Sequence, residues 1–145
     1  MKALIQRVSS AKVVVNEQNV GSIDRGMLVL LAIEKQDSIQ TIDKMCHKLL
    51  NYRVFPDQDN KMNLNVQQVE GELLVVSQFT LAADTQKGMR PSFSCAAEPE
   101  RAREYYLTCV EQLKSSGLLV KTGEFAADMQ VSLCNDGPVT FMLSC

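Results

Sequence analysis

The chain has 145 residues, of which 46% are hydrophobic and 22% are charged, and its formal net charge at pH 7 is −2. This length and composition predict one globular domain, residues 1–145. The small negative charge argues against a broad phosphate-binding face, and no apolar run approaches the roughly 18 residues that span a membrane. Because the N-terminus also lacks the apolar core of a signal peptide, we expect a cytoplasmic protein.

The N-terminal third predicts several strands separated by polar turns. Its first two apolar segments alternate with polar residues or are rich in β-branched side chains. The polar residues 16–19 predict a hairpin turn before a short return strand. A continuous apolar run after Gly26 predicts a central strand. The predicted strands are residues 3–8, 11–15, 20–23 and 27–33.

Two stripes of apolar residues at helical spacing predict two amphipathic helices. The first follows Asp37 or Ser38, either of which can cap a helix. The second begins at Pro99, which suits a first helical turn, and ends before Gly117. His47, the only histidine, lies one step off the first stripe and is interpreted as a partly exposed helix residue.

The remaining apolar segments predict further strands. The run Leu73–Val76 is typical of a strand buried on both faces. Residues 129–133 and 139–143 predict two antiparallel strands, and the intervening Asn135-Asp136-Gly137-Pro138 is a strong turn signal. Strands outnumber helices without regular interleaving, which indicates an α+β fold with a mostly antiparallel or mixed sheet and two main helices. Residues 55–61 predict a loop, 62–69 an extended segment and 118–121 a short strand.

The five cysteines are an odd number without a CxxC pair, so we interpret them as reduced thiols. Cys46 and His47 are the only adjacent pair of Cys or His residues, and two such ligands are fewer than a zinc site requires. There is also no GxGxxG, P-loop, GxSxG or HExxH motif. We therefore predict neither a metal nor a cofactor.

The candidate site is the polar cluster Ser77-Gln78-Phe79-Thr80, which follows the Leu73–Val76 strand. A strand end delivers several hydrogen-bonding groups to one place on a rigid support. Alternatively, the two hydroxyl groups only satisfy backbone groups where the strand stops. Without a visible base a hydroxyl is a weak nucleophile. Backbone N–H groups and the Gln78 amide could instead stabilise an oxyanion, which suits an already activated ester.

Residues 82–97 form a long segment without periodicity, and such segments are usually functional. Lys87 and Arg90 stand there beside Gly88, Pro91 and Phe93. The two cations could hold a phosphate while the aromatic ring stacks on a base. The alternative is a solvated loop with a turn stiffened by proline.

The segments SQFTL at residues 77–81 and NDGPVTF at residues 135–141 resemble the D-aminoacyl-tRNA deacylase family. The similarity runs along essentially the whole chain and includes GMRPSF at residues 88–93 and FAADMQVSL at residues 125–133. The resemblance implies a barrel-like sheet, a homodimer, and hydrolysis of the ester between a D-amino acid and the terminal adenosine of tRNA. A non-catalytic dimeric RNA-end or ligand-binding module and a small-molecule esterase remain alternatives.

The resemblance also implies a role for each matching residue. Ser77, Gln78, Phe79 and Thr80 would line the acyl pocket. The roles of Lys87 and Arg90 do not come from the resemblance: the modest net charge agrees with a protein that holds only the single-stranded acceptor end of the tRNA, and we expect these two cations to contact it. A Gly137–Pro138 turn with a cis bond, oriented by Arg7, would enter the pocket of the partner subunit. There an L side chain would collide with the turn, whereas glycine would not, so glycyl-tRNA would also be cleaved. Because no base is visible, we favour activation of water by the 2′-hydroxyl group of the RNA, with Thr80 not acting as a nucleophile.

Overall fold

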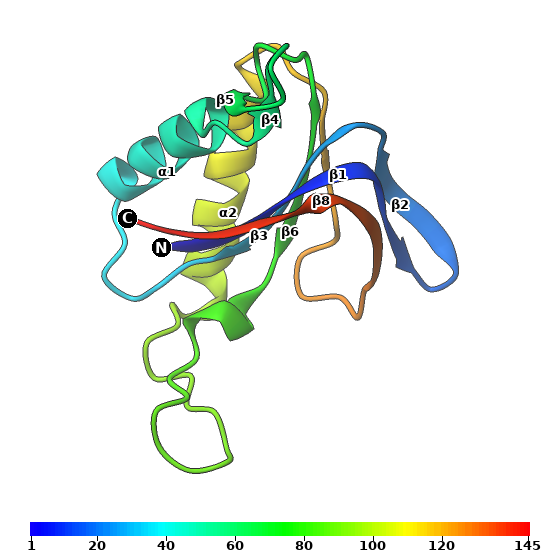
Figure 1. Ribbon diagram of the computed structural model, residues 1–145. Coiled ribbons are helices and arrows are strands. Elements are labelled where there is room, and N and C mark those ends of the chain that lie inside the picture. The colour runs from blue at the N-terminus through cyan, green and yellow to red at the C-terminus, as the bar shows by residue number, and fades with distance from the viewer.

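The computed structural model describes residues Met1–Cys145 and contains one large curved sheet, two main helices that cover one of its faces, and a small separate hairpin (Figure 1). The helices are α1 (Ile39–Asn51) and α2 (Pro99–Lys114), and a short 3₁₀ helix, η1, spans Phe79–Ala82. The strands of the large sheet are β1 (Lys2–Val15), β2 (Gln18–Ile23), β3 (Gly26–Ala32), β6 (Glu72–Ser77), β7 (Val120–Thr122) and β8 (Gln130–Ser144), and β4 (Phe55–Pro56) pairs with β5 (Met62–Leu64).

The large sheet is mixed and nearly closes on itself. Its order is β2-β1-β3-β6-β7, with β8 paired to the other edge of β1. The pairs that include β1 are antiparallel, whereas β3–β6 and β6–β7 are parallel. At the closing edge, a Cβ atom on Gly21 would lie 2.4 Å from the carbonyl oxygen of Thr122, so only glycine permits this approach of β2 to β7. The predicted α+β fold with a mixed, barrel-like sheet and two helices is confirmed.

The strands β3 and β6 are buried on both faces, as the continuous apolar run of β6 predicts. Side chains on one face of β6, including Leu73 and Val75, pack beneath the two helices. Those on the opposite face, Leu74 and Val76, fill the inside of the curved sheet. This arrangement fixes the end of β6, where the candidate site begins.

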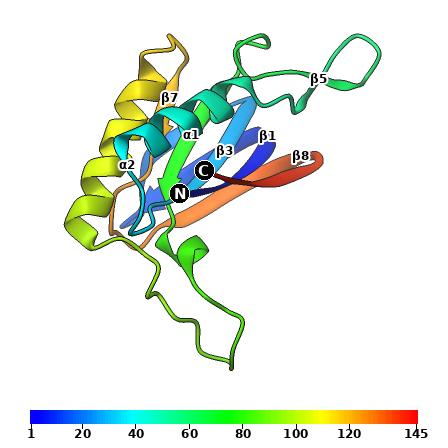
Figure 2. The same ribbon diagram turned by 90° about the vertical axis from the view of Figure 1, so that its left-hand side faces the viewer.

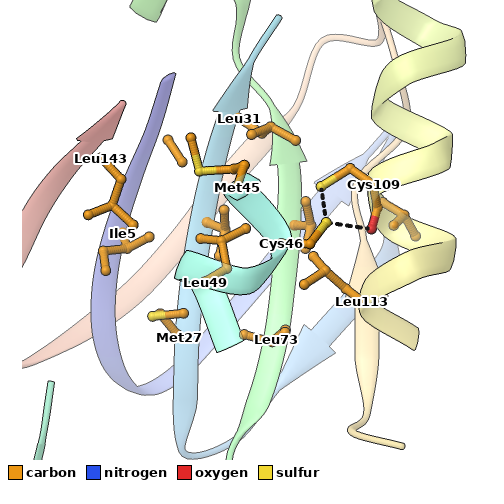
Figure 3. Packing of buried hydrophobic residues seen from close by; sticks show 14 of the residues in the cluster. Ile5, Met27, Leu31, Met45, Cys46, Leu49, Leu73, Cys109, Leu113 and Leu143 are labelled. Atoms are coloured by element: carbon orange, nitrogen blue, oxygen red, sulfur yellow. Dashed lines mark hydrogen bonds between the residues drawn. The ribbon is translucent and has the colours of Figure 1, made fainter. Parts of the chain in front are cut away.

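The helices begin where the sequence predicts. Ser38 caps α1, and its side chain and that of Thr41 form a reciprocal capping box. Pro99 opens α2. Where the two helices face one another, the Sγ atoms of Cys46 and Cys109 lie 3.3 Å apart within the core (Figure 3). Neither helix is long and apolar enough to cross a membrane.

Two predictions about strands are wrong. Residues 3–8 and 11–15 form one continuous strand, β1, rather than two. The two strands predicted at residues 129–133 and 139–143 likewise fall on one strand, β8, which begins at Gln130, because both segments pair with β1. Gln6 is paired with Thr140 and Val8 with Asn135, so residues 136–139 stand opposite Arg7 alone. The turn signal therefore produces a bulge within a strand, here called the 136–139 turn, and not a hairpin. The predicted extended segment 62–69 is strand only over Met62–Leu64.

Candidate active site

The candidate site begins where β6 ends. Beyond Ser77, the backbone N–H of Gln78 donates a 2.8 Å hydrogen bond to the carbonyl oxygen of Leu31 on the adjacent strand β3. The chain then turns into η1, which carries Phe79 and Thr80. Since β3 and β6 are parallel and buried, this strand end is a rigid support for the polar residues that follow it.

Two backbone N–H groups at the start of η1 are available to a ligand. The first residues of a helix have no intrahelical acceptor, and the N–H groups of Phe79 and Thr80 donate no hydrogen bond within the chain. Beside them, Nε2 of Gln78 donates to Oγ1 of Thr80. Because that oxygen already accepts a hydrogen bond, the Thr80 hydroxyl is free to donate its proton outward. The cluster therefore presents several donors to an oxygen atom that carries negative charge.

A cavity of about 530 Å³ opens beside these donors. Ser77, Gln78 and Phe79 form part of its wall, and Thr80 does not. The remaining wall is mainly apolar and comes from α2 and the segment just before it, from residues 125–131, and from the ends of β3 and β6 with the residue that follows β3. A cavity of this size and character suits an apolar or aromatic group of a ligand that is anchored at one polar end.

Several residues of this wall were assigned no role by the sequence analysis. Tyr106, Phe125 and Met129 line the cavity, and so does Asp128, which is its only carboxylate. The hydroxyl of Tyr106 donates to the carbonyl oxygen of Val75 at 2.8 Å, and burial raises the pKa of Tyr106, so this phenol remains protonated. Three of these four residues belong to the FAADMQVSL segment, whose resemblance to the family was the one sequence feature that could have pointed to them. That this segment lies beside β6 depends on tertiary structure.

No histidine lines the cavity. His47 lies on α1 beside Lys48 and Cys145, at a separate shallow hollow. This location agrees with its interpretation as a partly exposed helix residue. Among the side chains of the cavity wall, only the Asp128 carboxylate is an ordinary candidate for a general base.

The 136–139 turn is a second candidate functional feature, and Arg7 on the neighbouring strand β1 binds it. Nε of Arg7 donates to the carbonyl oxygen of Asp136 at 2.8 Å and lies 3.3 Å from its carboxylate. Nη1 of the same guanidinium donates to the carbonyl oxygen of Val54 at 2.7 Å. The peptide bond between Gly137 and Pro138 is cis, and both residues are exposed. No residue of the turn lines the cavity of the same chain.

Lys87 and Arg90 lie in a loop that projects away from the sheet and helices (Figures 1 and 2). Reciprocal backbone hydrogen bonds between Asp84 and Ser92, of 2.8 and 3.0 Å, close the base of this loop. Both cations are exposed, and neither forms an ion pair. The ring of Phe93, near the loop base, packs on that of Phe79 with 5.0 Å between centroids. The loop therefore connects two free cations to the candidate site.

Comparison with known proteins supports the resemblance seen in the sequence. A D-aminoacyl-tRNA deacylase of Pseudoalteromonas translucida (strain TAC 125) is 62% identical over 144 residues, which cover 99% of each chain. One of Haemophilus influenzae (strain PittEE) is 62% identical over 145 residues and 99% of each chain. A solved structure described as c-Myc DNA Unwinding Element Binding Protein superposes with a TM-score of 0.95 and 41% identity, covering 100% of this chain and 99% of that one.

A second solved structure, described as a probable eukaryotic D-amino acid tRNA deacylase, shares the fold with a TM-score of 0.86 at 17% identity. It covers 99% of this chain, and 98% of its own chain is covered. The family model described as D-Tyr-tRNA(Tyr) deacylase matches residues 4–144, and thus nearly the whole sequence. From the extent of that match and the identity of the two bacterial relatives, it follows that this chain belongs to the D-Tyr-tRNA(Tyr) deacylase family.

Proposed function

We propose that this chain hydrolyses the ester bond of D-aminoacyl-tRNA and releases a free D-amino acid and tRNA. The observation that carries the proposal is the pair of unbonded N–H groups of Phe79 and Thr80 beside a largely apolar cavity. They belong to a chain whose close relatives bear the name D-aminoacyl-tRNA deacylase. An ester that links an amino acid to ribose is already activated. Donors that stabilise the negative charge developing on its carbonyl oxygen therefore supply the main contribution that its hydrolysis requires.

In the proposed reaction, the oxygen of a water molecule attacks the ester carbonyl carbon. The electron pair of the carbonyl moves to its oxygen, which accepts hydrogen bonds from the N–H groups of Phe79 and Thr80. The tetrahedral intermediate then collapses, and the bond between the acyl carbon and the ribose oxygen breaks. The ribose oxygen takes the proton that the water gave up, so the products are the amino acid and a free ribose hydroxyl.

We propose that the neighbouring 2′-hydroxyl of the terminal ribose helps to activate this water. The cavity wall contains no histidine, and its only carboxylate, that of Asp128, belongs to an exposed residue. The Thr80 hydroxyl accepts a hydrogen bond from Gln78 and has no basic side chain that could remove its proton. The protein then supplies position and oxyanion donors, and Thr80 is not a nucleophile.

Selection against L-amino acids is assigned to the 136–139 turn of a second subunit. The turn is exposed and lies apart from the cavity of its own chain, so it is available to a partner in a homodimer. We propose that the main-chain oxygens of Gly137 and Pro138 face the α-amino group of the substrate. A D side chain then points away, whereas an L side chain collides with the turn. Glycine has no side chain to collide, so glycyl-tRNA, including tRNA-Ala mischarged with glycine, is also a substrate.

The exposed cations Lys87 and Arg90 are assigned to the single-stranded acceptor end of the tRNA. Their loop is joined to the site through the contact of Phe93 with Phe79. A few phosphate contacts agree with the formal net charge of −2, because only the end of the RNA has to be held. We propose that the enzyme acts in the cytoplasm, which agrees with a tRNA substrate.

The experiment that tests the function measures release of amino acid from tRNA charged with the D or the L form of one amino acid. Glycyl-tRNA and the ethyl ester of the D-amino acid are assayed in parallel. Release from D-aminoacyl-tRNA and glycyl-tRNA, with the L form and the ethyl ester stable, is the expected result. Comparable cleavage of the ethyl ester would favour a small-molecule esterase. Binding of tRNA without any release would favour a non-catalytic RNA-end module.

A further inference from the structure

The side chain of Asn135, which directly precedes the 136–139 turn, is hydrogen-bonded to residues at the other end of the turn. Its Oδ1 accepts a 2.7 Å hydrogen bond from the backbone N–H of Val139, at the far end of the turn. Its Nδ2 donates to the Val139 carbonyl oxygen at 3.3 Å and to Oγ1 of Thr140 at 3.0 Å. One side-chain amide therefore joins the two ends of the turn through both its acceptor and its donors.

Thr140 connects this amide to the neighbouring strand. Its Oγ1 also accepts a 3.1 Å hydrogen bond from Nε2 of Gln6, the residue paired with it on β1. The turn is thus held at both ends: Arg7 binds the carbonyl oxygen of Asp136, while Asn135 and Thr140 hold Val139. Between these two attachments only Gly137 and Pro138 remain, and they are exposed.

We propose that Asn135 is a positioning residue whose amide, seated on Thr140, fixes the direction of the main-chain oxygens of the turn. It thereby sets the preference for D over L substrates. The inference rests on the proposed function, because only there does the turn meet a substrate. A side-chain amide is suited to this task because it combines an acceptor with two donors, whereas a carboxylate offers acceptors alone. Thr140 contributes through its hydroxyl, so serine should replace it and valine should not.

The test measures kcat/KM for D- and L-aminoacyl-tRNA carrying the same amino acid and compares their ratio between variants. Asn135→Ala should lower the ratio at least about tenfold, the scale of one to two lost hydrogen bonds. Asn135→Asp, which keeps the acceptor for Val139, should lower it less. Thr140→Val should also lower the ratio, and Thr140→Ser should preserve it. Asn51→Ala is the matched control, since Asn51 donates only to the carbonyl oxygen of His47 at the end of α1.

Thermal unfolding of every variant separates selectivity from folding. If Asn135→Ala does not fold, the Asp variant and the two Thr140 variants decide the question. A wild-type chain that cleaves neither substrate would overturn the proposed function together with this inference. A selective wild type whose D/L ratio is unchanged in folded Asn135→Asp and Thr140→Val variants would overturn the inference alone.

Discussion

Nε of Arg7 donates a 2.8 Å hydrogen bond to the carbonyl oxygen of Asp136, while Nη1 of the same guanidinium binds Val54. A lysine at position 7 would carry one ammonium group and could not make both bonds at their present spacing. We expect Arg7→Lys to lower kcat/KM for D-aminoacyl-tRNA about 10- to 100-fold, because hydrogen bonds to charged groups contribute about 1.5–3 kcal/mol each. Arg103→Lys, at an exposed position on α2, is the control. Equal activity of Arg7→Lys and the control would contradict this role for Arg7.

Replacement of Thr80 by alanine should leave most of the activity. The backbone N–H groups that we assign to the oxyanion remain in Thr80→Ala, so we expect kcat within about tenfold of the wild type, whereas loss of a covalent nucleophile costs on the order of 10⁶. The wild type should hydrolyse a substrate that ends in 2′-deoxyadenosine more slowly than Thr80→Ala hydrolyses the normal substrate. Single-turnover hydrolysis measures both effects.

A different result would move the chemistry from the RNA to the protein. If Thr80→Ala abolished hydrolysis, Thr80 would be the nucleophile. If Asp128→Asn abolished it while the deoxy substrate remained active, the carboxylate that lines the cavity would be the base.

Mixing two inactive variants should restore activity if the turn serves the pocket of a partner. Ala127→Phe is designed to fill the cavity, and Arg7→Ala is designed to release the turn. In a mixed dimer, one site then combines an intact cavity with an intact turn. If subunits exchange at random, half the dimers are mixed and about a quarter of all sites are active. A turn that serves its own chain would give no recovery, and neither would a protein that remains monomeric.

The polar end of β6, where the candidate site begins, was predictable from the sequence because this feature is local. A run of apolar residues that fills both faces of β6, followed at once by Ser77 and Gln78, places polar groups at a buried strand end whatever the rest of the fold does. The opposite wall could not be predicted in this way. Tyr106 and Asp128 reach the cavity only through the packing of α2 and the return of the chain to β8.

The 136–139 turn illustrates a different limit of the sequence. Alternating residues on both sides of Asn135-Asp136-Gly137-Pro138 are equally compatible with a hairpin and with a bulged single strand. The choice is made elsewhere, because β1 is long enough to pair with both flanks of the turn. The bond from Arg7 to Val54 has the same origin, since it joins residues 47 positions apart.

Neutralising the loop cations should weaken tRNA binding and reduce its dependence on salt. The logarithm of the association constant falls with the logarithm of the salt concentration, and each lost contact with a single-stranded phosphate makes this slope less steep by about 0.7. For Lys87→Gln combined with Arg90→Gln we therefore expect a slope that is less steep by roughly 1.4. Lys61→Gln is the control, because Lys61 lies between β4 and β5 in the chain, and these strands lie at the end of the molecule opposite the loop (Figures 1 and 2). An unchanged slope in the double variant would contradict the assignment of these cations to the RNA.

The carboxylate of Glu34 should contribute stability that disappears in acid. Partial burial raises its pKa, but the hydrogen bond and charge of the Met1 ammonium, with those of Lys2, hold the pKa of Glu34 below its usual value of 4.5. A carboxyl whose pKa is lower in the folded chain binds protons more readily when the chain unfolds. Its contribution is therefore complete above pH 4.5 and is lost as the pH falls through the folded value.

Glu34→Gln should accordingly lower the free energy of unfolding by on the order of 0.5–1 kcal/mol at neutral pH, the range of partly exposed ion pairs. The difference from the wild type should shrink as the pH falls below 4.5 and vanish below the folded-state pKa of Glu34, where the carboxyl is protonated in both states. Urea unfolding at a series of pH values measures it, with Glu104→Gln on the exposed face of α2 as the control. A difference that grew as the pH fell would contradict this prediction, because a lowered pKa makes the contribution of Glu34 smaller in acid. It would show that the Met1 and Lys2 ammonium groups do not stabilise the folded chain through Glu34.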